Sequence, residues 1–184
     1  MRIIGGAHRG KVLKVPKDLP VRPTTDFAKE ALFNILNNKV DFTELSVLDL
    51  FSGTGHIALE FASRGASSVS AVDMHVKCVR FLAEASKQLQ LNITAVKSDV
   101  FEFLKKSGGQ YSLIFADPPY ELPNIADIHR LVLEKHLLAA DGLLIIEHGP
   151  KTNLAELPGF EQMRKYGHVH FSFFTFSGSQ IIQS

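Results

Sequence analysis

From residue 46 onward the sequence alternates short apolar segments with longer segments of mixed polarity, and this alternation restricts the possible folds more than any other feature. The apolar segments are expected strands, at 46–51, 68–73, 93–97, 111–116 and 142–147. The segments between them have helical spacing, at 56–64, 75–90, 100–106 and 124–138. Strands that are apolar on both faces and separated by helices form a parallel sheet covered on both sides. The sequence therefore predicts an α/β fold.

The C-terminal part differs, because two strand-like segments follow each other with no helix between them. Residues 160–167 and 168–176 are almost adjacent in the chain. Strands joined by so short a connection pair in antiparallel fashion. We therefore expect a C-terminal antiparallel hairpin on the edge of a mostly parallel, seven-stranded sheet.

The N-terminal residues predict a smaller hairpin around a glycine-rich turn, with strands at Arg2–Ile4 and Lys11–Val15. A helix follows, with Thr24 or Thr25 as its N-cap and apolar residues at 28, 31, 32, 35 and 36. No repeat or linker interrupts the chain. We expect a single domain over residues 1–184, with an N-terminal hairpin extension at 1–22 and a core at 23–184.

Charge is distributed unevenly along the chain. The formal net charge is +1, but residues 1–22 contain six Lys or Arg and one acid. A cationic segment on a mildly acidic body suggests a nucleic-acid partner, although a solvated basic terminus fits the charge equally well. The residues expected to bind RNA phosphates without reading sequence are Arg2, Arg9, Lys11, Lys14 and Arg22.

Cysteine content and hydropathy suggest a reducing, aqueous compartment. Cys78 is the only cysteine, so no disulfide can form within the chain, and its apolar helical neighbours make it an expected core thiol. No apolar stretch approaches the roughly 18 residues that span a bilayer, and no signal-peptide layout is visible. We expect a cytoplasmic protein with no membrane partner.

Acidic residues recur where the expected parallel strands end. These residues are Asp49, Asp73, Asp99 and Asp117. In open α/β sheets, ligands bind beyond the carboxyl ends of the strands. One or two such acids could be chance, but four form a pattern that indicates a ligand site.

The loop after the first of these strands, Gly53-Thr-Gly55-His-Ile-Ala58, fits the nucleotide-binding pattern G-x-G-x-x-G/A. Asp73 follows Gly53 by 20 residues, the spacing of an acid that holds ribose hydroxyls. Asp49 would repel the pyrophosphate of a dinucleotide but attract the sulfonium and ammonium of S-adenosylmethionine. Asp99 could accept a hydrogen bond from the adenine amino group. The loop thus favours a methyl donor over a redox cofactor.

The fourth strand ends in Asp117-Pro118-Pro119-Tyr120. Two prolines cannot continue a ladder of backbone hydrogen bonds, so the strand must end there. The segment then offers a carboxylate and backbone carbonyls as acceptors beside an aromatic ring. Asp117 and the Pro118 carbonyl could accept both N–H bonds of an exocyclic amine, while Tyr120 stacks on the base. We expect the base to be flipped out to reach this clamp.

These motifs together resemble the class I methyltransferases, and the head R-I-I-G-G-A-H-R-G-K with R-P-T-T-D-F-A-K-E-A-L-F-N-I-L resembles the RsmD-type enzymes. The resemblance runs from Arg2 to about Glu147. It implies a Rossmann-like fold and methylation of guanine N2 (position 966 in the usual numbering) in 16S ribosomal RNA, free or in an assembling small subunit. It also implies S-adenosylmethionine as cofactor, S-adenosylhomocysteine as product and a monomer without metal. The cofactor-binding residues implied are Asp49, Phe51, Gly53, Gly55, Asp73, Met74, Asp99 and Val100.

The sequence departs from the usual family pattern in three motifs. Ser52 and Thr54 stand where Ala and Ser are commoner, and Asp73 stands where Glu is usual, but these changes keep the hydrogen-bonding chemistry. Tyr120 stands where Phe also occurs, which leaves the base open between guanine and adenine.

Alternative functions follow from the same motifs. The main one is an adenine-N6 methyltransferase acting on DNA or RNA. A protein-glutamine methylase would prefer Asn at position 117. The redox alternative is a small NAD(P)-binding protein, and the non-enzyme alternative is a pseudo-enzyme that only binds RNA. His168 and His170 alternate on one strand face, but the sequence offers no close third ligand, so we expect no metal site.

Overall fold

A computed structural model describes residues 1–17, 19 and 26–176. Its strands are β1 (Ser46–Leu50), β2 (Ser68–Asp73), β3 (Ile93–Lys97), β4 (Tyr111–Ala116), β5 (Leu138–His148), β6 (Phe160–Tyr166) and β7 (Val169–Thr175). Its helices are α1 (Asp26–Leu36), α2 (His56–Ser63), α3 (Val76–Leu89), α4 (Val100–Lys106) and α5 (Ile125–Glu134), with short 3-10 helices η1 (Gly6–His8) and η2 (Phe42–Glu44). The expected helix caps at Thr24 and Thr25 lie outside the described residues.

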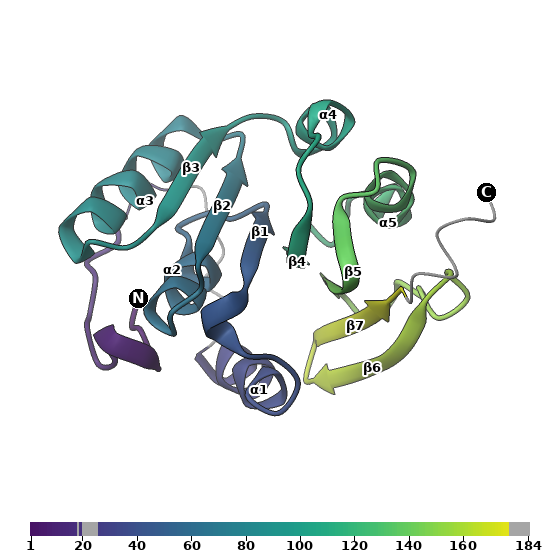
Figure 1. The fold of residues 1–184 in the computed structure, drawn as a ribbon, viewed down its shortest axis with the longest axis horizontal. Helices are drawn as coiled ribbons and strands as arrows, with labels where there is room; N and C mark the ends of the chain where they lie inside the picture. Colours follow the sequence, from purple (N-terminus) through teal and green to yellow (C-terminus); the bar gives the residue numbers. More distant parts are fainter. Residues whose placement is uncertain (18, 20–25, 177–184) are drawn as a thin grey trace.

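The strands of the described chain form one seven-stranded sheet in the order β3-β2-β1-β4-β5-β7-β6 (Figure 1). Strands β1 to β5 are parallel, while β7 pairs antiparallel with both β5 and β6. From β1 the sheet extends through β2 to β3 on one side, and the chain then crosses back to place β4 on the other side of β1. The carboxyl ends of β1 and β4 are therefore neighbours. This is the switch point at which ligands bind in doubly wound sheets.

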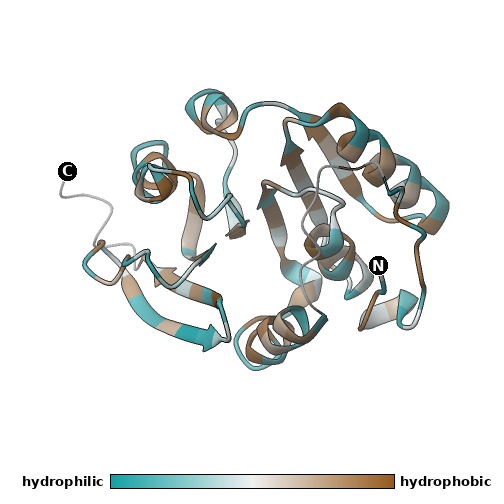
Figure 2. Ribbon diagram, turned by 180° about the vertical axis from the view of Figure 1, so that it is seen from behind, coloured by the Kyte–Doolittle hydropathy of each residue, from teal (hydrophilic) through white to brown (hydrophobic). Residues whose placement is uncertain are grey.

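The sheet separates two apolar layers. One layer contains side chains of α1, α2 and α3, and the other contains side chains of α4 and α5. Side chains alternate between the two faces of the sheet along β1, so Val47 faces the first layer, while Leu48 and Leu50 face the second. The edge strand β6 is mostly exposed and largely hydrophilic (Figure 2), as expected of a strand with one unpaired edge.

The N-terminal hairpin is present, but in a reduced form. One isolated antiparallel bridge joins Arg2 and Val12, and η1 forms the turn between them. The regular strands expected at Arg2–Ile4 and Lys11–Val15 do not form. Ile3 and Leu13 are buried and belong to the same core layer as α1 and α2, so this segment is part of the fold.

The predicted helix at 124–138 is wrong in its last turn. Helix α5 ends at Glu134, His136 takes a φ of 51°, and β5 already begins at Leu138. Leu137 and Leu138 have helical spacing in the sequence, but they are buried beside the start of β4, where the Tyr111 N–H donates to the Leu137 carbonyl at 2.8 Å. Tertiary packing outweighed helical periodicity at this point.

Candidate cofactor and base site

The glycine loop joins β1 to α2 through a strained turn. Phe51 has a φ of 60°, which is rare for a residue with a side chain and costs on the order of 1–3 kcal/mol. Gly55 has a φ of 75°, and a Cβ there would lie 2.3 Å from a methyl carbon of Leu82 in α3. Such strain persists only where the surroundings impose it, and it gathers at ligand sites. The loop is thus held in a fixed shape against α3.

Asp49 lies under this loop and is buried. Its Oδ2 accepts a hydrogen bond from the Ala58 N–H in the first turn of α2 at 3.1 Å. Burial, together with the negative charge of Asp73, raises the pKa of the Asp49 carboxyl to about 8. At neutral pH this side chain is therefore mostly uncharged.

Asp73, at the end of β2, ties the loop to the next helix. Its Oδ2 accepts from the Gly53 N–H and its Oδ1 accepts from the His75 N–H, each at 2.8 Å. A carboxylate has about four lone-pair sites, so two further donors such as ribose hydroxyls can still be accommodated. The sequence analysis predicted that Asp73 holds ribose hydroxyls, but it did not predict the hydrogen bond by which Asp73 fixes the glycine loop.

The other expected cofactor-binding residues lie on the neighbouring strand ends. Asp99 is the exposed N-cap of α4 and accepts from the Glu102 N–H at 3.0 Å, while Val100, the first residue of α4, is buried. Met74 is 60% exposed, unusual for so apolar a side chain. The Phe51 ring packs edge-on against Phe101 of α4, with centroids 6.4 Å apart. The expected cofactor role of these residues stays a prediction.

The Asp117–Tyr120 segment leaves the sheet at the end of β4, directly beside the glycine loop. The Asp117 N–H donates to the Leu50 carbonyl of β1 at 3.2 Å. Pro118 is buried, whereas Pro119 is exposed and Tyr120 is half-buried. A methyl donor on the loop and a base in the clamp would therefore be neighbours.

Glu147 contacts the expected base clamp, although the sequence analysis did not single it out. It is 4% exposed, near the end of β5, and its Oε1 accepts the Tyr120 hydroxyl hydrogen bond at 2.8 Å. Its carboxyl is also hydrogen-bonded to that of Asp117. Burial raises the pKa of Glu147, against the opposing effect of these two hydrogen bonds. The signal was available, because the fifth strand, like the others, ends in an acid.

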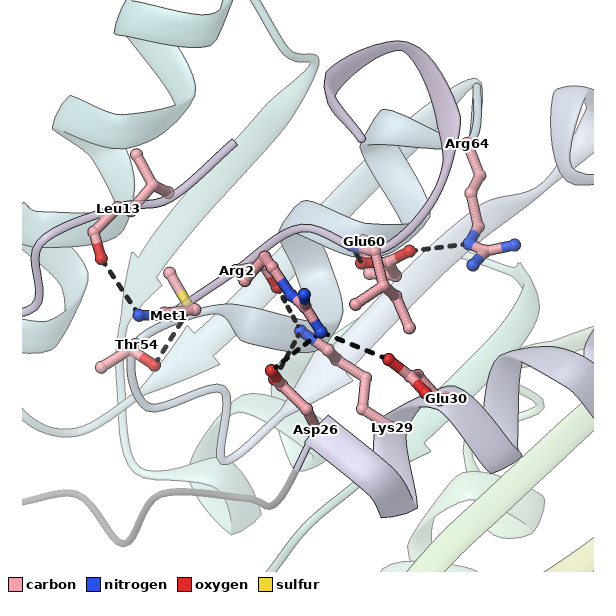
Figure 3. Close-up of polar contacts among 10 residues, drawn as sticks. Met1, Arg2, Leu13, Asp26, Lys29, Glu30, Thr54, Glu60 and Arg64 are labelled. Atoms are coloured by element: carbon pink, nitrogen blue, oxygen red, sulfur yellow. Dashed lines mark hydrogen bonds and ion pairs between the residues drawn. The ribbon is translucent and has the colours of Figure 1, made fainter. Parts of the chain in front are cut away.

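The basic N-terminal segment is attached to α1 and α2 by a buried polar network (Figure 3). Glu60 is fully buried; one of its oxygens accepts from the Ile4 N–H and the other from Arg64, each at 2.9 Å. Lys29, also buried, donates to the Arg2 carbonyl at 2.6 Å. The Thr54 hydroxyl of the glycine loop lies 3.7 Å from the sulfur of Met1. The segment thus reaches the expected cofactor site.

The cationic side chains of this segment differ in whether they are paired with carboxylates. Arg9, Lys11 and Lys14 are exposed. Arg2 is also exposed, but its guanidinium is paired with carboxylates of α1, so part of its charge is neutralised. Arg22 lies outside the described residues.

Two histidines, His148 and His170, lie opposite each other on the paired strands β5 and β7. His148 is buried, with Nε2 2.8 Å from the Ser172 hydroxyl and Nδ1 3.0 Å from the Gly149 carbonyl. His170 lies against the His148 ring. Within the described parts of the chain, no three His, Cys, Asp or Glu side chains lie where they could share a metal ion. No helix among those residues is long and apolar enough to cross a membrane.

Comparison with known proteins identifies the family. The model of a family described as Conserved hypothetical protein 95 matches residues 1–175. Ribosomal RNA small subunit methyltransferase D of Escherichia coli K12 is 31% identical, over 86% of this chain and 79% of that protein. The chain belongs to the RsmD family of methyltransferases. The resemblance found in the sequence is confirmed.

A second relative and two solved structures are also similar to this chain. Ribosomal RNA small subunit methyltransferase D of Buchnera aphidicola is 26% identical over 95% of this chain and 91% of that protein. The solved structure of yhhF from Escherichia coli superposes with a TM-score of 0.86 and 27% identity, over 97% of this chain and 98% of that one. A hypothetical protein of Thermus thermophilus gives a TM-score of 0.82 and 30% identity, over 96% of this chain and 99% of that one. The expected Rossmann-like methyltransferase fold is confirmed.

Proposed function

We propose that this protein transfers a methyl group from S-adenosylmethionine to the exocyclic N2 of a guanine in 16S ribosomal RNA. The observation that carries the proposal is the hydrogen bond from the Asp117 N–H to the Leu50 carbonyl, which fixes the base clamp beside the glycine loop. Membership of the RsmD family supports the RNA substrate and the methyl donor.

The donor supplies an electrophilic methyl group on a positively charged sulfur. The chain's residues provide the complementary electrostatics: Asp49 and Asp73 place carboxyl groups around the loop that would hold the cation. Asp117 and the Pro118 carbonyl accept the two amine hydrogens, which favours a pyramidal nitrogen and the charge that develops on it. After transfer, Asp117 can take the proton that leaves nitrogen. No metal is needed, because the methyl group is already activated.

The N-terminal segment would guide the RNA to the clamp. Arg9, Lys11 and Lys14 are exposed on a segment that contacts the glycine loop through Met1. Contacts to phosphates position a nucleic acid without reading its sequence. The substrate would be free 16S RNA or an assembling small subunit in the cytoplasm, bound by a monomer.

The test is methylation of unmodified substrate. Purified protein is incubated with isotope-labelled S-adenosylmethionine and either protein-free 16S RNA or small subunits from cells that lack the modification. Digestion and mass spectrometry should identify N2-methylguanosine, and Asp117→Ala should abolish it. Labelled N6-methyladenosine would instead establish the adenine alternative. Absence of label from both substrates would refute the proposal.

A further inference from the structure

The register of the sheet places two carboxyl groups side by side at the base clamp. Ala116 of β4 pairs with Ile146 of β5, so Asp117 and Glu147 occupy the next positions of these parallel strands. Phe115 and Ile145, two residues earlier, share the core layer of α1 to α3. Because side chains alternate along strands, Asp117 and Glu147 lie on that same face of the sheet. The contact between them is a consequence of the fold.

A hydrogen bond between two carboxyl groups requires one proton. Asp117 and Glu147 are hydrogen-bonded, so they cannot both be carboxylates while this bond exists. Glu147 is almost completely buried, whereas Asp117 is half-buried. Burial favours the neutral form, while a nearby methyl donor and amine hydrogens would favour the carboxylate on Asp117.

The same glutamate also fixes the aromatic part of the clamp. The Tyr120 hydroxyl donates to Glu147 Oε1 at 2.8 Å. On its other side the ring lies against Gly149, where a Cβ would approach Tyr120 Cδ2 to 2.9 Å. The ring is thus held at its hydroxyl and at its edge by two residues from the end of β5.

We propose that Glu147 is a positioning residue of the methyl-transfer site, sharing one proton with Asp117 in a carboxyl–carboxylate hydrogen bond and accepting a hydrogen bond from the Tyr120 hydroxyl. It holds the amine acceptor and the stacking ring in a fixed relation without contacting either substrate. This inference rests on the proposed function and deepens it.

The surroundings of Glu147 leave these two groups as its described polar partners. Across the sheet, β7 places Phe171 opposite Glu147. The imidazoles of His148 and His170 belong to the alternate positions of their strands, and His148 is engaged with Ser172. Asp117 and Tyr120 are accordingly the groups that influence its ionisation besides burial. Loss of the shared proton at alkaline pH would break the bond and set two negative charges side by side.

The proposal is tested by single-turnover methylation across pH with saturating donor. Glu147→Ala should slow transfer by about 10- to 100-fold, the scale of a misplaced reacting group. Glu147→Gln should recover the rate to within about threefold of the parent, under about 1 kcal/mol of barrier, because its amide can donate to Asp117 and accept from Tyr120. It should also lose the alkaline decline of the parent. The exposed Glu156→Ala is the matched control and should behave as the parent.

Two results would overturn the positioning role. One is a Glu147→Ala rate within about threefold of the parent; the other is a Glu147→Gln variant as slow as Glu147→Ala with an unaltered alkaline limb. Donor affinity, measured by calorimetry, should be the same in all variants. Carboxyl-carbon NMR of the free protein gives a readout independent of activity: Glu147 should titrate above its ordinary range, and higher still in Tyr120→Phe. If the parent fails to methylate RNA but this titration holds, the proposed function fails and the carboxyl pair stands.

Discussion

Binding of the methyl donor should expel a proton from Asp49. This carboxyl is 1% exposed, and its burial and the adjacent Asp73 raise its pKa to about 8. At pH 7 about nine-tenths of the protein therefore carries a neutral Asp49. A cationic donor on the glycine loop favours the carboxylate and lowers this pKa. If it falls to about 6, about 0.8 proton should leave for each donor bound at pH 7, and close to 0.9 if it falls to about 5 or lower.

The sign of the pH dependence follows from this release. Because the complex holds fewer protons than the free protein, donor affinity should rise with pH between roughly 6 and 8 and then level off. The release should fall to about half a proton at pH 8, where half of the free protein is already ionised. His56, at the start of α2, should not contribute, because burial lowers its pKa to about 3 and it is neutral throughout this range.

The assay is calorimetric titration with S-adenosylmethionine at pH 7 in phosphate and in Tris, whose ionisation enthalpies differ. The difference in observed heat gives the number of protons released. Asp49→Asn is the matched variant, since its amide oxygen can still accept from Ala58 but cannot titrate. The donor's own amino group, with an ordinary pKa near 8, contributes equally to both proteins. Equal proton release by the parent and Asp49→Asn, at normal affinity, would refute the reasoning.

Three further predictions concern the head and the clamp. Gly6→Ala should lower the free energy of unfolding by well over the about 1 kcal/mol expected for Gly10→Ala. Both glycines have positive φ, but only Gly6 lies against α2, where an added Cβ would be 1.8 Å from a backbone oxygen. Chemical denaturation measures the difference, and equal losses would contradict docking of the N-terminal segment on α2. Arg9→Ala combined with Lys11→Ala should flatten the salt dependence of RNA affinity by about 0.7–0.9 for each lost phosphate contact, whereas an unchanged slope in filter binding would place both side chains away from RNA. Asp117→Asn should slow single-turnover methylation by about 10²–10³ with donor affinity retained, and a rate within about threefold of the parent would exclude it as a transition-state acceptor.

The fold could be predicted in large part from local pattern. Apolar strands alternating with amphipathic helices leave a doubly wound sheet as the one consistent arrangement, and the closely spaced segments at 160–176 require a hairpin. The exception at Leu137 and Leu138 has a simple cause. Their spacing continues a helix, but pairing with β4 stabilises a strand, and sequence periodicity carries no information about distant partners.

The sequence by itself determined which chemical groups stand at the strand ends: Gly53, Gly55, Asp73 and the Asp117–Tyr120 clamp follow recognisable spacings. Only the tertiary structure decided what those groups touch. Tertiary packing buries Asp49 and so raises its pKa. It also attaches the basic N-terminal segment to α2, through the hydrogen bond from the Ile4 N–H to Glu60. It also placed Glu147 beside Asp117, although 30 residues separate them in the chain. Register between strands creates such contacts, and register is fixed by the packing of the whole sheet.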